Sequence, residues 1–464
     1  MKRVFALAAA LFCALAAPTL AQAPSQGERT QALEIYRTIV GFDTSTEGKQ
    51  NPAMAAFLAE RFRAGGFAAE DVHILPLGDT ASLLVRYRGD GSGGRPILLL
   101  GHMDVVPARR ADWERDPFTL IEEDGFFFGR GSLDNKAGIA HITATLLSLR
   151  AEGFTPTRDL IVWFSGDEET SGATTIALLG EHRALIADAE FALNSDAGGG
   201  GLTPQNQPTR FGLQTAEKTY ASFTFTARNP GGHSSAPRAD NAIYALADAL
   251  ARLRAFQFPV MWNDTTLESM RVGAQGASGP LADAMRRFAA NPNDRRVQQI
   301  LGQSPNFSNG LRTTCVATML EGGHAENALP QSAVATVNCR IFPGVAPADV
   351  QAELQTIAGA DVTIAPLGPS SASDASPLRP DVLAAVTAAL NAHAPGTQIS
   401  PFMSSGATDG LYFRAAGIPT YGVGGVFIRE SDAFAHGLNE RVPVDRFYNG
   451  LTHWRVLLTT IAGR

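Results

Sequence analysis

Apolar and polar residues follow two different periods along the first part of the chain. Between residues 29 and 65 the apolar positions recur at helical spacing. The segments SLLVRYRG (82–89) and PILLLGHMD (96–104) have the composition of strands, and the second is apolar enough to be buried on both faces. A helix is predicted over residues 136–153, and a buried strand that runs into a turn over 159–169. Strand, helix and strand in this order predict an α/β layer around a mostly parallel sheet.

The pattern changes near residue 215 and changes back near residue 370. Between these positions the predicted elements follow the order strand, helix, strand, strand, helix and strand, over residues 220–228, 240–253, 313–323, 332–344, 347–358 and 361–367. This order is that of the ferredoxin-like split arrangement. Residues 255–311 interrupt it with polar, Pro- and Asn-containing sequence, in which short helices are predicted. Beyond residue 370 the α/β pattern of the first part of the chain returns, with helices predicted over 380–393 and 445–461.

These changes predict an α/β fold with two domains. A mostly parallel sheet with helices on both faces would be built from residues 24–215 and 369–464. Residues 216–368 would form a ferredoxin-like α+β domain inserted into it. The length of 464 residues, 45% of them hydrophobic, suffices for more than one hydrophobic core.

Residues 1–23 have the composition of a secretory signal peptide. Two basic residues precede an apolar run from Val4 to Ala17, and Ala21-Gln22-Ala23 resembles a signal-peptidase site. An uncleaved membrane anchor is the alternative, but a span usually needs about 20 apolar residues, and Pro18 ends this run early. We therefore expect an exported protein, periplasmic or secreted, with no stable membrane span after cleavage.

Charge and cysteine content exclude two classes of protein. The formal net charge is −7, and no cluster of Lys and Arg is present that could follow phosphates, so nucleic acid is excluded as a partner. Beyond residue 23 only Cys315 and Cys339 remain, too few for a disulfide scaffold. An oxidising compartment permits a bridge between their two predicted strands. Two separately buried thiols are an equal alternative.

Candidate metal ligands fall where the predicted buried strands end. His102 and Asp104 are two residues apart, so on an extended chain they point to the same side. Asp104 could therefore hold the second N–H of a metal-bound imidazole. The other candidates lie in or beside glycine-containing turns: Asp134 in GRGSLDNKAG, Glu168 and Glu169 in SGDEETSGA, Asp196 in FALNSDAGGG and His436 in AHGLNERVP.

Each candidate alone has an ordinary structural explanation. Asp134 could be a helix N-cap, Asp196 a turn residue, a lone histidine a capping or core residue, and adjacent glutamates a solvated surface. The combination is harder to explain in this way, because ligands of open α/β sheets bind beyond the carboxyl ends of the strands. Histidines with several carboxylates form a ligand set suited to zinc. Such an excess of carboxylates can hold two ions if one carboxylate bridges them.

The segments GHMDVVP, GRGSLDNKAG, GDEETSG, NSDAGG and AHGLNERV, in this order, resemble the M20 family of co-catalytic zinc metallopeptidases, which includes carboxypeptidases and aminoacylases. The resemblance covers almost the whole chain after residue 23. It implies two zinc ions, one held by His102, Asp196 and Asp134 and the other by Glu169, His436 and the same bridging Asp134. By the same resemblance Asp104 would orient His102, Glu168 would be the general base, and the Asp134–Asn135 peptide would be cis.

The resemblance extends to the inserted domain, where it implies substrate contacts. NPGGHSSAPRADNA is similar to the lid motif in which a histidine, here His233, reaches across a homodimer and stabilises the reacting oxyanion. Without the resemblance, His233 is simply a loop residue before a helix. Asn327 and Arg340 match lid positions that contact substrate, and a guanidinium is the natural bidentate partner of an α-carboxylate. Gly406 in SSGATDG would line the carboxylate pocket.

Two features point to one branch of the family. Several branches have Glu at the position of Asp196, whereas Asp is similar to the aminoacylase and carboxypeptidase S branch. The long segment 255–311 is similar to that branch as well. Neither feature defines a substrate.

The sequence therefore predicts hydrolysis of an amide bond by metal-activated water. Glu168 would take the proton of the water and pass it to the leaving nitrogen, and zinc and His233 would stabilise the oxyanion. Arg340 would hold the free carboxylate of a peptide, which makes the enzyme a carboxypeptidase-type exopeptidase. An aminoacylase, acting on N-acyl amino acids, or a dipeptidase is the alternative.

Two other classes fit less well. A secreted zinc- or peptide-binding protein without catalysis would lack the equivalent of Glu168, which is present. A serine hydrolase would need a G-x-S-x-G elbow, and neither SGATDG nor GRGSLD has that form.

Overall fold

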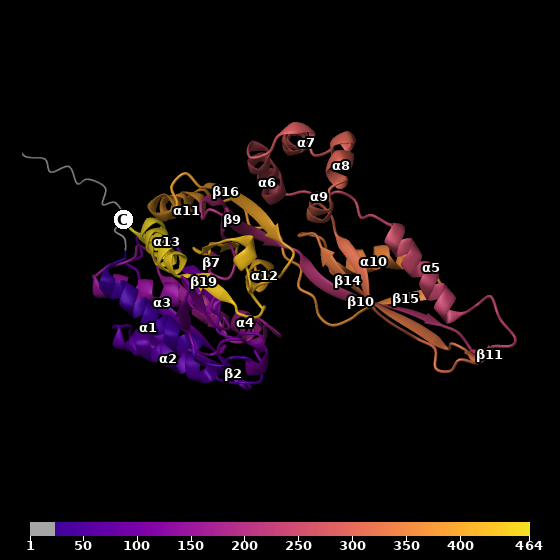
Figure 1. The fold of residues 1–464 in the computed structure, drawn as a ribbon, viewed down its shortest axis with the longest axis horizontal. Coiled ribbons are helices and arrows are strands. Elements are labelled where there is room, and N and C mark those ends of the chain that lie inside the picture. Colours follow the sequence, from indigo (N-terminus) through magenta and orange to yellow (C-terminus); the bar gives the residue numbers. More distant parts are fainter. Residues whose placement is uncertain (1–23) are drawn as a thin grey trace, which may run out of the picture.

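The computed structural model describes residues 24–464, so the predicted signal peptide lies outside the described residues. Its main sheet has ten strands and a central region of parallel pairing (Figure 1). Along the sheet the strands are β1 (Val72–Leu77), β2 (Thr80–Tyr87), β6 (Leu160–Ser165), β3 (Ile97–His102), β7 (Phe191–Asn194), β17 (Thr420–Gly422), β9 (Pro208–Glu217), β8 (Gly199–Leu202) and β18 (Phe427–Ile428), with β16 (Gln398–Ser404) paired to β9.

Parallel pairs form the middle of this sheet. β3 runs parallel to both β6 and β7, and β17 runs parallel to β7. Every residue of β3, β6 and β7 is buried, because strands covered on both faces can be apolar throughout. β1 and β2 add an antiparallel edge next to β6. The predicted α/β class with a mainly parallel sheet is thus confirmed.

Helices cover both faces of the sheet, as predicted. Successive side chains of a strand point to opposite faces, and accordingly Leu99 belongs to one core whereas Leu98 and Leu100 belong to another. The larger core is covered by α1 (Gln26–Val40), α2 (Asn51–Ala64), α3 (Lys136–Ala151), α11 (Pro380–His393) and α13 (Val444–Ala462). The smaller one is covered by α4 (Ala173–Leu179) and α12 (Gly410–Ala415).

A second, four-stranded antiparallel sheet extends away from the main sheet (Figure 1). Its strands lie in the order β12 (Thr314–Gly322), β14 (Ser332–Ile341), β10 (Thr219–Arg228) and β15 (Val362–Pro366). With α5 (Ala242–Ala255) and α10 (Pro347–Ala358) packed against it, the chain order is β-α-β-β-α-β, the order that the sequence predicts. We call this unit the lid.

Segment 255–311, the two cysteines and the lengths of the helices each answer a sequence prediction. Residues 255–311 form the short helices α6 (Asp264–Gln275), α7 (Gly279–Ala290), α8 (Arg295–Gly302) and α9 (Pro305–Gly310), with a small core of their own. Cys315 and Cys339 face each other across β12 and β14 and form a disulfide, which decides between the two alternatives left open. Within the described residues, no helix is both long enough and apolar enough to cross a bilayer.

Candidate metal centre

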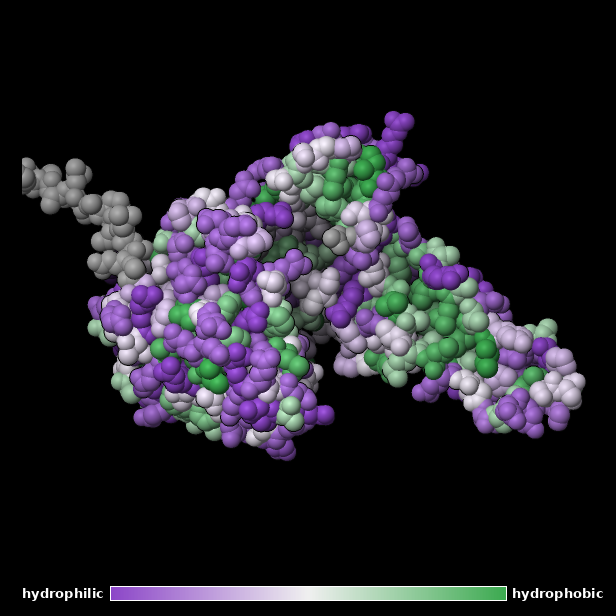
Figure 2. Space-filling view, viewed as in Figure 1, coloured by the Kyte–Doolittle hydropathy of each residue, from purple (hydrophilic) through white to green (hydrophobic). Residues whose placement is uncertain are grey.

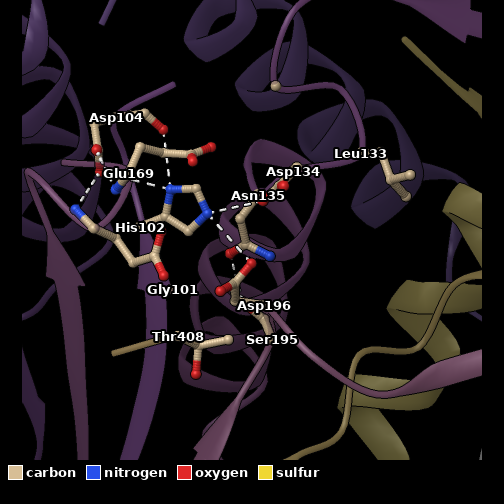
Figure 3. Close-up of polar contacts among 12 residues, drawn as sticks. Gly101, His102, Asp104, Leu133, Asp134, Asn135, Glu169, Ser195, Asp196 and Thr408 are labelled. Carbon is tan, nitrogen blue, oxygen red and sulfur yellow. Dashed lines mark hydrogen bonds and ion pairs between the residues drawn. The ribbon is translucent and has the colours of Figure 1, made fainter. Parts of the chain in front are cut away.

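The predicted ligands come together at the carboxyl ends of three neighbouring strands of the main sheet (Figure 3). His102 is the last residue of β3, the turn with Glu168 and Glu169 follows β6, and Asp196 lies two residues after β7. Because β6, β3 and β7 are adjacent and parallel, residues far apart in sequence meet at one edge. Asp134 joins them from the turn before α3.

His102 lies between two carboxylates. Its Nε2 is 2.9 Å from Asp134 Oδ1 and 3.3 Å from Asp196 Oδ1. Ligand atoms about 2.0–2.2 Å from a tetrahedral zinc ion are separated by roughly 3.3–3.6 Å. The His102–Asp196 separation therefore already has the size that a shared zinc ion needs, and the His102–Asp134 separation is slightly shorter.

Asp134 reaches a second histidine with its other oxygen. His436 Nε2 is 3.2 Å from Asp134 Oδ2 and 2.9 Å from Glu169 Oε1. One oxygen of Asp134 thus faces His102 and the other faces His436, which is the arrangement required of a bridging carboxylate. The peptide between Asp134 and Asn135 is cis, as the resemblance implies.

The ligand atoms also form two compact groups. In one, atoms of His102, Asp134 and Glu169 all lie within 4.8 Å of one another, and in the other the same is true of His102, Glu168 and Asp196. These groups overlap with the two ligand sets implied by the family resemblance but are not identical to them. His102 belongs to both groups, and His436 contacts the cluster only through Asp134 and Glu169.

The charges of the cluster fit a cation. Burial, together with the neighbouring Asp196 and Asp409, raises the pKa of Glu168 to about 10, and burial likewise raises the pKa of Asp196 to about 8. Although burial opposes it, hydrogen bonds with His102 and His436 lower the pKa of Asp134. The carboxylates outnumber the histidines. A bound divalent cation would therefore offset both the repulsion among the carboxylates and the cost of burying their charges.

Asp104 connects His102 to the glutamate turn, and it does so differently from the sequence prediction. His102 Nδ1 lies 3.0 Å from the main-chain oxygen of Asp104 and 3.6 Å from its carboxylate. The carboxylate instead accepts hydrogen bonds from the main-chain N–H groups of Glu168, at 3.1 Å, and Glu169, at 2.9 Å. Asp104 therefore holds the imidazole mainly through its backbone and positions both glutamates through its side chain.

Asp167, the third carboxylate of the SGDEETSGA segment, takes no part in the cluster. Its side chain accepts hydrogen bonds from the main-chain N–H groups of Ala173, at 2.7 Å, and Thr174, at 2.9 Å. It thereby satisfies the free N–H groups at the start of α4.

Sequence reasoning missed Glu440, which supports the loops that contain Asp134 and His436. Its buried carboxylate accepts three main-chain N–H groups between residues 131 and 134, at 2.8–3.0 Å, and pairs with Arg130 Nη1 at 2.7 Å. Arg130 Nη2 in turn donates to the main-chain oxygen of His436 at 3.3 Å. The feature of the sequence that could have indicated Glu440 is its position in the AHGLNERV motif, four residues after His436.

Asp409 is a second missed residue, in the loop for which only Gly406 was predicted. Its side chain is buried, burial raises its pKa to about 6, and its Oδ1 has no hydrogen-bond partner among the described residues. The preceding Thr408 accepts a hydrogen bond from Asn194, whose side-chain oxygen accepts the N–H of Asp196. This loop is therefore connected to a predicted metal ligand.

The residues predicted to contact substrate lie in two separate places. Arg340 Nη1 donates to the main-chain oxygen of Ser405 at 2.6 Å, which brings Arg340 beside the exposed Gly406. His233 and Asn327 are exposed: His233 ends β11 (Gly232–His233), and Asn327 directly precedes β13 (Ala328–Leu329), with which β11 forms a small ribbon. That ribbon is at the end of the lid farthest from the main sheet, so these two residues do not reach the metal cluster of their own chain (Figure 1).

Solved structures share this fold. An M20 family metallo-carboxypeptidase, Sso-CP2 from Sulfolobus solfataricus, superposes with a TM-score of 0.66 at 16% identity, covering 93% of this chain and 99% of its own. A dinuclear metal-binding peptidase of the M20 family from Bacillus subtilis superposes with a TM-score of 0.60 at 14% identity, covering 94% of this chain and 98% of its own. The chain thus has the fold of the M20 metallopeptidases.

The sequence identifies the family. The pattern of peptidase family M20/M25/M40 matches residues 98–460. The chain belongs to this family of metallopeptidases and amidohydrolases, and it is an enzyme.

Two curated relatives carry different activities in their names. The N-fatty-acyl-amino acid synthase/hydrolase PM20D1 of Mus musculus is 31% identical over 272 residues, which are 56% of this chain and 52% of the mouse protein. The probable carboxypeptidase S-like 2 of Dictyostelium discoideum is 29% identical over 279 residues, which are 58% of this chain and 52% of that protein. The chain spans about half the length of each of these relatives.

Proposed function

We propose that this enzyme hydrolyses the amide bond of N-acyl amino acids, next to a free carboxylate. The observation that carries the proposal is the shared Asp134, which faces His102 with one oxygen and His436 with the other, beside a turn that presents two glutamates. The name of the mouse relative supports the choice of N-acyl amino acids. Carboxypeptidase-type cleavage of peptides is the second candidate, favoured by the carboxypeptidase S-like relative.

The proposed cofactor is a pair of zinc ions. His102, Asp196 and Asp134 would hold one ion, and Glu169, His436 and the same Asp134 would hold the other. Nitrogen and carboxylate ligands without a thiolate suit zinc. When bound, the ions would polarise the amide carbonyl and lower the pKa of a water toward neutrality.

The residues of the chain would handle the proton and the substrate charges. Glu168 would take a proton from the attacking water as its oxygen bonds to the carbonyl carbon, and would deliver that proton to the nitrogen as the amide bond breaks. Asp104 keeps Glu168 in place through the main-chain hydrogen bond described above. Arg340, beside the loop that contains Gly406, would bind the substrate carboxylate.

The lid would complete the site from a second subunit. The edge strand β12 exposes Val316, Met319 and Leu320 with relative exposures of 61%, 62% and 68%, and Figure 2 shows hydrophobic residues gathered on the lid. An exposed apolar edge strand is a template for pairing with another chain. We infer a homodimer in which His233, with Asn327 beside it, approaches the metal cluster of the partner and stabilises the oxyanion. The composition of residues 1–23 supports export of this enzyme.

A substrate panel tests the proposed function. N-acyl amino acids, dipeptides and longer peptides would be assayed beside matched compounds whose carboxylate is blocked as an amide. We expect turnover of N-acyl amino acids, at least tenfold slower turnover of the blocked compounds, loss of activity with a chelator and recovery with zinc. Faster turnover of the peptides would select the second candidate, and equal turnover of blocked and free compounds would contradict the role of Arg340.

A further inference from the structure

A half-open cavity of about 300 Å³ adjoins the metal cluster and is not used by the mechanism above. Asp134 and Asp196, which both contact His102, form part of its wall. From these residues the cavity extends between α3 and α13 to Trp454, which is fully buried. One part of its wall thus lies beside the place where the scissile amide would be held, and another part is formed by a buried residue of the main domain.

The wall of the cavity is suited to a hydrocarbon. Asp134 and Asp196 are its only charged residues. The apolar side chains in the wall are those of Leu133, Ala137, Ala197, Val426, Ile428, Ala435 and Trp454.

The polar side chains of the wall mostly have partners within the protein. Ser195 Oγ donates to Asn135 Oδ1 at 2.8 Å, and His141 Nε2 lies 2.8 Å from the main-chain oxygen of Phe447. Trp454 Nε1 is the exception, having no hydrogen-bond partner among the described residues. A wall of this kind offers a ligand contact area and few specific polar groups.

The cavity is separate from the proposed carboxylate pocket. Neither Arg340 nor any residue of the 404–410 loop lines it. A substrate whose carboxylate binds Arg340 and whose amide lies at the cluster would therefore direct its acyl group away from Arg340. The volume is at the lower end of the roughly 300–1,000 Å³ found for ligand sites, so the cavity suits one part of a substrate.

We propose that this cavity is the acyl-chain subsite of the enzyme and takes the hydrocarbon chain of an N-acyl amino acid. The proposal rests on the proposed function, because it assumes that the acyl carbonyl lies at the metal cluster. The cavity has a volume of only about 300 Å³, so the benefit of a longer chain ends when the chain fills it. Each methylene buried before that point raises kcat/KM about fourfold.

A series of N-acyl-phenylalanines from acetyl to palmitoyl tests the subsite, in the zinc-loaded enzyme and in two variants. Ile428→Trp and Val426→Trp each fill the cavity from its wall, and the second guards against failure of the first to fold. Ile74→Trp is the matched control, because Ile74 is also a partly buried isoleucine but lies on the edge strand β1. We expect kcat/KM of the wild type to rise with chain length and then level off. The octanoyl-to-acetyl ratio should fall at least tenfold in the cavity variants and stay unchanged in the control.

Two further arms separate the possible failures. Binding of octanoate, measured by calorimetry, needs no turnover: we expect it in the wild type and at least tenfold weaker in Ile428→Trp. If no N-acyl amino acid is hydrolysed, the proposed function fails. Whether the cavity binds a hydrocarbon chain is then decided by octanoate binding alone: binding that is weakened in Ile428→Trp supports the subsite, and no binding overturns it. Hydrolysis without chain-length dependence, together with no octanoate binding, overturns the subsite and leaves the proposed function standing.

The second arm compares Leu-Phe with N-(4-methylpentanoyl)-Phe, which has the same carbon skeleton without the amino group. We expect the acyl compound to be the better substrate. A faster reaction of Leu-Phe that is lost in Ile428→Trp would show that the cavity accepts peptide side chains, and would overturn the acyl assignment.

Discussion

Glu168 and Glu169 are adjacent in one turn, and apart from His102 they group with different side chains. Glu169 groups with His102 and Asp134 and lies 2.9 Å from His436, whereas Glu168 groups with His102 and Asp196. Asp104 accepts the main-chain N–H of both. Neighbours in sequence are thus presented to different partners.

The separation predicts different results for the two glutamates. Glu168→Gln should retain its metal and lower kcat by about 10³-fold, because only proton transfer is removed. Glu169→Gln should lower the metal content as well as the activity, because a ligand is weakened. Metal analysis of the purified variants, next to kcat, is the measurement. Equal metal loss in both variants would contradict the assignment of roles.

Glu440 allows a prediction about support of the cluster. Glu440→Gln replaces one carboxylate oxygen with an amide that cannot accept the hydrogen bonds of Arg130 and residue 131. We expect the free energy of unfolding to fall by about 3 kcal/mol, because one partner of a buried ion pair is removed, together with weaker metal retention. Urea unfolding and metal titration measure the two effects.

The control for Glu440 is Glu123→Gln. Glu123 pairs with Arg115 at the surface, with 46% of its side chain exposed, so its loss should cost less than about 1 kcal/mol. Equal effects of the two substitutions would show that the buried contacts of Glu440 do not stabilise the metal-binding loops.

At the scale of the element, α11 and α13 meet through a pair of histidines. His393 Nε2 lies 3.1 Å from His453 Nδ1; His453 is fully buried and His393 is half-buried. Burial lowers the pKa of His393 to about 4 and the pKa of His453 well below its ordinary value. Both are therefore neutral in the folded protein at neutral pH.

This contact predicts a loss of stability in mild acid. The folded-state pKa of His393 is below its unfolded value of about 6.5, so between pH 6.5 and 4 the unfolded chain binds a proton that the folded chain does not. The free energy of unfolding should fall over this range, with His393 contributing on the order of 1–2 kcal/mol by pH 5. Urea unfolding of His393→Gln from pH 7 to 5 should show a smaller fall than the wild type. His324→Gln, an exposed control, should follow the wild type.

The whole molecule combines a main domain that carries the metal cluster with a lid that carries His233 at its far end (Figure 1). The distance between them is explained if the site is completed by a partner subunit. Leu320, with 68% exposure on the lid edge, and Ile176, with 52% exposure on α4, offer a matched pair of exposed apolar residues. We expect Leu320→Arg to produce monomers and Ile176→Arg to leave the dimer intact, as measured by light scattering.

Subunit mixing tests the completion of the site. His233→Ala and Glu168→Gln should each be nearly inactive alone. After mixing and exchange, about half the dimers would be mixed, each with one intact site, so about a quarter of wild-type activity should return. No recovery, in mixtures shown to exchange subunits, would place His233 outside the active site.

Hydrophobic pattern and motifs were enough to predict the fold class, the central buried strands and main helices, the β-α-β-β-α-β order of the lid and the identity of the clustered side chains. Local chemistry suffices for these, because a strand that begins with four apolar residues, as β3 does, is stable only when covered on both faces. The family motifs alone indicate His102, Asp134 and Glu169.

The tertiary structure decided which atoms meet. It brought Glu440 to the Asp134 loop across 306 residues of sequence and placed Asp409 near Glu168. In the folded chain the carboxylate of Asp104 accepts the N–H groups of the glutamate turn, Cys315 and Cys339 form a disulfide, and a cavity forms whose wall includes Trp454. The strands β1 and β8, and the short sheet of β4 (Ile121–Glu123), β5 (Phe126–Phe128) and β19 (Arg441–Pro443), were not predicted. Long-range hydrogen bonds and cavities depend on how elements pack together, and hydrophobic periodicity describes each element only by itself.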